Sequence, residues 1–182
     1  MSRIIILNGV GSAGKSSIAR ALQDITTQPY LHVAMDTFLD MLPAVYGDHP
    51  DGLTFETVIV DGEPAVAIRS GIVVEQVLRG MRRAVAALAA QGNNLIVDDV
   101  MLGSEMEDYR ILLTDFDVSL IAIRAPLAVL EERERQRGDR LIGLARWQYD
   151  LVHKGMKYDL EIDTSVATPA VCALRIKEAL GV

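Results

Sequence analysis

The sequence lacks several features that mark whole classes of protein. Among its 182 residues Cys172 is the only cysteine, so no internal disulfide can form. This thiol stands in the apolar run 171–174, which favours a buried, unreactive side chain. The three histidines, His32, His49 and His153, show neither the spacing of metal ligands nor a serine or cysteine partner in the sequence. We therefore assign them no catalytic role.

Long hydrophobic runs and an excess of positive charge are also missing. The first apolar run covers only residues 4–7 before Asn8 and Gly9, which is too short for a signal peptide or a membrane span. The net charge is -7 and the isoelectric point is about 4.9, a balance that repels phosphate backbones and anionic lipids. We expect a cytoplasmic protein that acts on a small molecule, with no nucleic-acid or membrane partner.

The hydrophobic pattern predicts an α/β fold. Half of the residues are hydrophobic, enough for one buried core in a single domain over residues 1–182. Apolar runs predict parallel strands at 4–7, 95–97 and 118–123, with weaker ones at 31–35 and 158–162. Helical periodicity predicts helices at 16–24, 71–91, 127–137 and 168–180. This alternation is typical of a doubly wound sheet, whose ligands bind beyond the carboxyl ends of its strands.

Residues 43–69 have a different composition. Gly47, Pro50, Gly52, Gly62 and Pro64 interrupt the stretch around 53–60, which predicts a short hairpin. We interpret 43–69 as an insertion that covers the substrate site.

The most specific motif is a phosphate-binding loop, here called the phosphate loop (residues 9–17). Residues 9–16 fit G-x-x-x-x-G-K-[ST] between a predicted strand and a predicted helix. In this motif backbone N–H groups cradle phosphates, Lys15 reaches the β- and γ-phosphates, and the Ser16 hydroxyl binds magnesium. The motif predicts ATP and Mg²⁺; the alternative is a glycine-rich turn with a chance lysine. The predicted nucleotide-binding residues are Gly9, Gly11, Ser12, Ala13, Gly14, Lys15, Ser16 and Ser17.

Three carboxylates follow predicted strands. Asp98 and Asp99 end the run 95–97 and should point to opposite faces, so we assign Asp98 to the metal and Asp99 to an acceptor. Asp36 follows the strand at 31–35 and is the candidate general base for an acceptor hydroxyl. The alternatives are that Asp98 or Asp99 caps the next turn and that Asp36 caps a helix.

Four arginines are concentrated in residues 131–140, whose sequence is Glu-Glu-Arg-Glu-Arg-Gln-Arg-Gly-Asp-Arg. Guanidinium groups match phosphate oxygens, and a segment that bends at Gly138 would form a lid over 133–143. Arg133 and Arg137 share a helix face at i, i+4 spacing, so we prefer these two as catalytic residues. The alternative is a solvated face of Glu and Arg pairs, which would include Arg135 and Arg140.

Several blocks together resemble the chloramphenicol phosphotransferase-like family of P-loop kinases, over nearly the whole chain. The matching blocks are residues 5–9 with 12–16, the Asp36 segment, 96–100 with 102–103, 137–140, 152–153, Gly155, 158–159 and 163–164. The resemblance implies a three-layer P-loop kinase fold with a five-stranded parallel sheet, as in shikimate and adenylate kinases. It also implies ATP as the donor, a primary hydroxyl as the acceptor and Asp36 as the proton acceptor, and it places Arg133 and Arg137 near the phosphates.

The chain departs from that family at Val10-Gly11, where the family has a Gly-Ser pair, and at Met101, where an aromatic residue is usual. We expect Met101 to contact the acceptor. Residues 43–69 do not match, so the acceptor stays open: chloramphenicol, a similar compound, or another small alcohol. A nucleotide-hydrolysing switch is the alternative of another class. The sequence has no N-K-x-D signature, the motif that recognises guanine. Asp36 and the arginines favour transfer of the phosphoryl group to an acceptor hydroxyl rather than to water.

Overall fold

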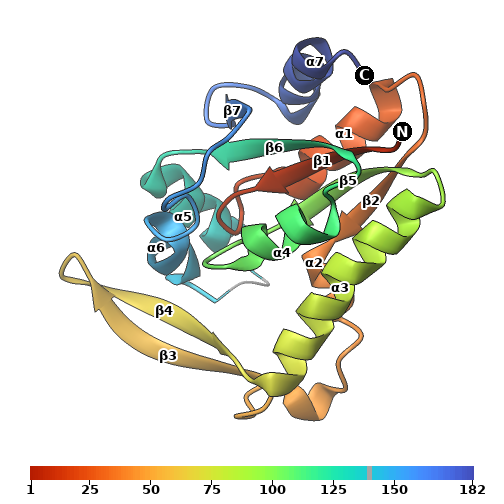
Figure 1. Ribbon diagram of the computed structural model, residues 1–182. Helices are drawn as coiled ribbons and strands as arrows, with labels where there is room; N and C mark the ends of the chain where they lie inside the picture. The colour runs from red at the N-terminus through yellow and green to blue at the C-terminus, as the bar shows by residue number, and fades with distance from the viewer. Residues whose placement is uncertain (139–140) are drawn as a thin grey trace.

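A five-stranded parallel sheet forms the centre of the computed structural model, which describes residues 1–138 and 141–182 (Figure 1). Its strand order is β2-β5-β1-β6-β7. The strands are β1 (Arg3–Asn8), β2 (Tyr30–Ala34), β5 (Asn94–Asp99), β6 (Asp117–Arg124) and β7 (Leu160–Asp163). The predicted α/β class with a five-stranded parallel sheet is thus confirmed.

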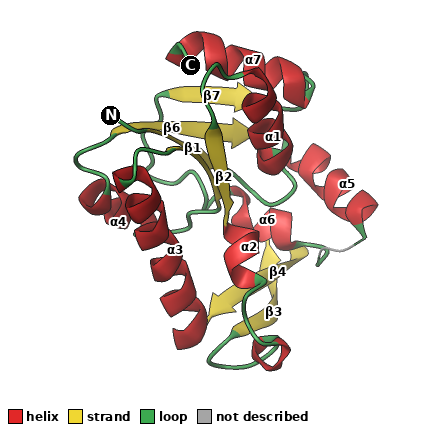
Figure 2. Ribbon diagram, turned by 90° about the vertical axis from the view of Figure 1, so that its right-hand side faces the viewer, coloured by secondary structure: helices red, strands yellow, loops and turns green. Residues whose placement is uncertain are grey.

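Helices cover both faces of the sheet, α1 and α7 on one and α3 and α4 on the other (Figures 1 and 2). The helices are α1 (Lys15–Ile25), α2 (Met35–Leu39), α3 (Ile72–Ala90), α4 (Glu105–Leu112), α5 (Leu127–Arg137), α6 (Leu144–Tyr149) and α7 (Pro169–Leu180), with a 3₁₀ turn η1 at Ala44–Tyr46. Four of these were predicted, whereas α2, α4 and α6 were not. None of the helices in the described ranges combines the length and apolar character needed to cross a bilayer.

Alternation along the central strand β1 builds two apolar layers. Ile5 and Leu7 face the layer formed with α1 and α7, and Ile4 and Ile6 face the layer formed with α3 and α4. All four side chains are almost completely buried. Because both faces are covered, the strand sequence is continuously apolar rather than alternating.

The insertion contains a hairpin that extends away from the sheet (Figure 1). Strand β3 (Leu53–Val60) pairs antiparallel with β4 (Glu63–Ser70). Residues 53–60, which the sequence suggested as a whole hairpin, are therefore only its first strand. Asp61 and Gly62 form the turn with φ of 50° and 82°, the conformation in which a two-residue turn matches the strand twist.

Close backbone contacts hold the base of this hairpin. Gly71 N–H donates to the Gly52 carbonyl at 2.7 Å, and Val73 N–H donates to the Asp51 carbonyl at 2.9 Å. A Cβ on Gly71 would lie 2.2 Å from the Pro50 carbonyl oxygen, so only glycine allows this approach.

Replacing Gly71 by alanine should lower the free energy of unfolding by about 1–3 kcal/mol, because backbone atoms must shift to admit the methyl group. Gly80→Ala is the matched control: Gly80 lies inside α3 with open space around its Cβ position. Alanine there should stabilise by about 0.5–1 kcal/mol. Urea denaturation measures both, and equal effects would contradict the packing argument.

Candidate functional site

The phosphate loop leaves β1 at the carboxyl edge of the sheet and leads into α1 at Lys15. Gly9 packs so closely on β6 that a Cβ would lie 2.4 Å from the Ile123 carbonyl oxygen, and Gly14 has φ of 96°. Lys15 is 7% exposed, and its Nζ donates to the carbonyls of Gly9 (2.9 Å) and Val10 (3.2 Å). The ammonium group therefore lies inside the curve of the loop.

Asp98 is the charge partner of this loop. Ser16 Oγ donates to Asp98 Oδ2 at 2.5 Å, and Lys15 Nζ lies 3.7 Å from Oδ1. His32 of β2 also approaches, with Nε2 3.6 Å from Oδ2. Burial raises the pKa of Asp98. Interactions with His32, Lys15 and Ser16 lower it by a larger amount, so the net pKa lies below its usual value. The carboxylate is therefore ionised beside the phosphate loop.

Asp99 and Met101 lie elsewhere than expected. Asp99 is 4% exposed; Tyr109 of α4 donates its hydroxyl to Oδ2 at 2.9 Å, and Val100 N–H donates to Oδ1 at 2.8 Å. Burial raises the pKa of Asp99. Met101 is 0% exposed in the apolar layer under α3 and α4. Since strand alternation turns Asp99 away from the loop and the core covers Met101, the expectation that both contact an acceptor does not fit their placement.

Asp36 is exposed in the first turn of α2, directly after β2. Ala34 occupies the N-cap position of this helix and no side chain caps it, so Asp36 is not the helix cap. Parallel strands end at one edge of the sheet, which places Asp36 at the same edge as the phosphate loop and Asp98.

Arg133 and Arg137 meet the phosphate loop at a cavity of about 380 Å³, here called the α5–α7 cavity. Arg133 donates to Thr164 Oγ1 (2.9 Å) and to the Thr164 carbonyl (2.7 Å), and Thr164 Oγ1 donates to the Ala13 carbonyl (2.9 Å). The cavity is lined by Ser12, Ala13, Gly14, Ser17, Ile18, Arg133, Gln136, Arg137, Thr164, Ala167, Pro169 and Cys172. Two cationic side chains therefore face the start of α1.

The rest of the arginine segment has other surroundings. Arg135 pairs with Glu132 at 2.7 Å on an exposed face, as the solvated alternative predicted for it. Asp139 and Arg140, within the expected lid at 133–143, lie outside the described residues.

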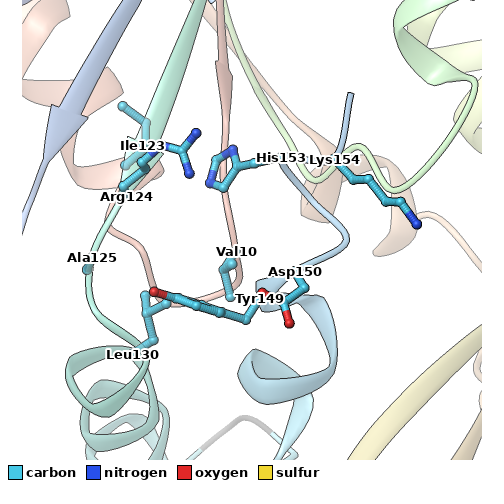
Figure 3. A pocket seen from close by; sticks show the side chains of 9 residues that line it. All are labelled: Val10, Ile123, Arg124, Ala125, Leu130, Tyr149, Asp150, His153 and Lys154. Atoms are coloured by element: carbon cyan, nitrogen blue, oxygen red, sulfur yellow. The ribbon is translucent and has the colours of Figure 1, made fainter. Parts of the chain in front are cut away.

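A second cavity of about 340 Å³, here called the β6–α6 cavity, adjoins the phosphate loop at Val10 (Figure 3). It is lined by Val10, Ile123, Arg124, Ala125, Leu130, Tyr149, Asp150, His153 and Lys154. His153 Nδ1 lies 2.7 Å from the Tyr158 hydroxyl, which accepts from Asn8 Nδ2 at 2.8 Å. Burial, together with the nearby charge of Arg124, lowers the pKa of His153 to about 4. His153 is therefore neutral near pH 7.

Four polar residues to which the sequence analysis gave no role support the site: Asn8, His32, Glu134 and Gln148. Asn8 Oδ1 accepts from Met101 N–H at 2.9 Å and so ties β1 to the segment after β5. Glu134, 2% exposed, accepts from Gly143 N–H at 2.8 Å and Ala145 N–H at 2.9 Å. Gln148 Oε1 accepts from Gly11 N–H at 2.8 Å. Only Asn8 could have been found from the sequence, because it is a polar residue between the apolar run 4–7 and the phosphate loop.

The depressed pKa of His153 predicts a pH dependence of stability. The unfolded chain takes up a proton near pH 6.5, whereas folded His153 stays neutral down to about pH 4. Because the unfolded state then binds more protons, this contribution to stability is lost as pH falls from about 6.5 to 4. His153→Gln should therefore lose less stability than the wild type over this range, as measured by urea denaturation at several pH values. If the unfolding free energies of the two proteins changed equally with pH, the lowered pKa of His153 would be contradicted.

Comparisons with known proteins agree with this geometry. A family model described as "Chloramphenicol phosphotransferase-like protein" matches residues 2–181. A Mycobacterium tuberculosis protein, provisionally named an O-phosphotransferase, is 31% identical over 173 residues, which cover 92% of this chain and 76% of the relative.

Solved kinase structures share the fold. A sugar kinase from a Janibacter species has a TM-score of 0.69 at 19% identity, covering 100% of this chain and 95% of its own. The Mycobacterium tuberculosis APS kinase in complex with AMPPNP and APS has a TM-score of 0.69 at 15% identity, covering 100% and 98%. The family model spans nearly the whole chain, residues 2–181. The chain therefore belongs to the chloramphenicol phosphotransferase-like family.

Proposed function

We propose that this protein transfers the γ-phosphoryl group of ATP to a hydroxyl group of a small molecule. One observation carries the proposal: the phosphate loop, the ionised Asp98 and the arginines of α5 converge at one edge of the sheet. The family and the kinase fold of the solved neighbours support a phosphotransferase.

The nucleotide would lie across the amino end of α1. Backbone N–H groups and Lys15 bind its phosphates, and the partial positive charge of the helix end favours them. The α5–α7 cavity takes the base and ribose, because it adjoins Ser12 and Ser17 and is walled by Ala167, Pro169 and the arginines. Arg133 and Arg137 then counter the phosphate charge from α5.

The donor atoms beside the loop fit Mg²⁺. Ser16 Oγ and the Asp98 carboxylate are adjacent hard oxygens, the ligand type that Mg²⁺ prefers. No group of three or more acidic, histidine or cysteine side chains forms a metal site in the described ranges, which suits an ion completed by phosphate oxygens and water. When bound, the ion would neutralise charge on the phosphates.

Asp36 would act on the acceptor. Its carboxylate orients the acceptor hydroxyl and takes its proton as the acceptor oxygen bonds to the γ-phosphorus. The bond from that phosphorus to the β–γ bridging oxygen breaks, and ADP leaves. The acceptor would lie between Asp36 and the insertion 43–69, and chloramphenicol or a similar compound is the acceptor that the family suggests.

The direct test incubates purified protein with Mg·ATP and chloramphenicol, with a panel of small alcohols in parallel, and follows ADP release and product mass. A phosphorylated alcohol is the expected product. A phosphorylated product from an alcohol other than chloramphenicol would support the proposed reaction and identify a different acceptor. Steady ADP release without a phosphorylated product would instead support a nucleotide-hydrolysing switch.

Asp36→Asn should lower kcat by about 10²–10⁴-fold while ATP affinity stays unchanged, because only the proton acceptor is lost. Lys15→Ala should weaken both ATP binding and transfer, since its ammonium group lies inside the phosphate loop. Asp40→Asn, on the exposed end of α2, is the matched control and should leave both unchanged. Calorimetry measures the ATP affinities. An Asp36→Asn enzyme with unchanged kcat would rule out Asp36 as the general base.

A further inference from the structure

The helix α6 contributes one side chain to the phosphate loop. We propose that Gln148 binds the γ-phosphoryl group of the nucleotide through its Nε2 amide, which adds it to the residues that hold the transferred group. The proposal rests on the function proposed above, because it presumes a bound nucleoside triphosphate.

The side-chain amide of Gln148 has a fixed orientation. Its Oε1 accepts from Gly11 N–H at 2.8 Å, and a Cβ on Gly11 would lie 3.3 Å from that oxygen. Gln148 is only 5% exposed, so it has little freedom to turn. Since one end of a carboxamide accepts and the other donates, a bond at Oε1 leaves the Nε2 donors available. Nε2 makes no hydrogen bond with the part of the chain that the structure describes.

The position of the Lys15 ammonium group indicates which phosphate lies near Gln148. Lys15 Nζ donates to the carbonyls of Gly9 and Val10, directly before Gly11, and the lysine of this motif reaches the β- and γ-phosphates. Gly11 itself does not line the α5–α7 cavity, which suits the nucleoside. We therefore place the terminal phosphoryl group, rather than the nucleoside, on the side of the loop where Gln148 contacts Gly11.

Buried hydrogen bonds hold α6 in place, so that Gln148 is presented on a rigid support. Glu134 of α5 accepts from Gly143 N–H and Ala145 N–H at the start of α6. The Gly143 carbonyl in turn accepts from Val66 N–H of β4 at 3.0 Å. A donor on an ordered element loses little conformational freedom when its ligand arrives, which makes it an effective phosphate contact.

Gln148 also differs in charge from the other phosphate-binding groups. Lys15, Arg133 and Arg137 are cations, whereas a carboxamide is neutral and donates along a defined direction. Such a donor is sensitive to the position of the phosphoryl oxygen rather than to total charge. It should therefore distinguish a triphosphate from a diphosphate.

The test compares Gln148→Glu with the wild type. Glutamate keeps the shape and an oxygen acceptor for Gly11 N–H, but it replaces the Nε2 donor by a carboxylate that repels the γ-phosphoryl group. Calorimetry with Mg·AMPPNP and with Mg·ADP measures both affinities. We expect AMPPNP binding to weaken about tenfold or more, and ADP binding, which involves no γ-phosphoryl group, to change by less than about threefold.

Gln76→Glu is the matched control, because it makes the same chemical change on an exposed position of α3. It should leave both affinities unchanged. Gln148→Met removes the Nε2 donor, together with the Oε1 acceptor of Gly11 N–H, without adding charge, and should weaken AMPPNP binding more than ADP binding. This second variant decides the matter if the glutamate variant does not fold, as judged by circular dichroism.

The outcomes separate the two proposals. Equal weakening of AMPPNP and ADP would mean that Gln148 only shapes the loop, and unchanged affinities would mean that it touches no phosphate; either result overturns the inference. A folded wild-type protein that binds neither nucleotide would instead overturn the proposed function.

Discussion

The parallel pairing of β1 with its two neighbours sets the position of every group in the site. The register aligns Leu7 with Asp98 on β5 and with Ile121 on β6, and it aligns Asn8 with Asp99, the last residue of β5, so the phosphate loop begins where β5 ends. The same register gives two adjacent carboxylates opposite environments. Asp98 meets Lys15 and Ser16 and has a lowered pKa, whereas Asp99 is buried against Tyr109 and has a raised one. A slip of one residue would exchange the two faces and separate the loop from its acidic partner.

Local patterns made most of the fold predictable. The strand at 95–97 and the helix at 127–137 are marked by composition and period alone, and the phosphate loop is a contiguous motif. Residues that act through distant contacts had no such signal. Glu134 stands among charged neighbours that look solvated, yet it is buried because it binds backbone N–H groups nine and eleven residues further on. Met101 was expected to contact the acceptor because it stands where the resembled family usually has an aromatic residue. Its burial depends on how the chain turns after β5, and no sequence period reveals that turn.

The segment from α5 to α6 connects the two sides of the site. Arg133 reaches the phosphate loop through Thr164, which bonds to Ala13. One residue later, Glu134 fixes the start of α6, and Gly143 contacts the hairpin strand β4. Adjacent residues of one helix therefore support the nucleotide side and the insertion side. The solved kinases of low sequence identity cover the whole chain, whereas the sequence blocks that resemble the family leave out the insertion 43–69.

The hairpin has few attachments for its length. Its base is fixed by the contact between Gly71 and Gly52, its flank by the bond from Val66 to Gly143, and its tip is the two-residue turn at Asp61 and Gly62. Side chains on paired strands alternate between faces with a period of two. Adding or removing residues in pairs near the tip would change the reach of the hairpin while every remaining side chain keeps its face. The length of this hairpin can therefore change without disturbing the sheet, the phosphate loop or α6.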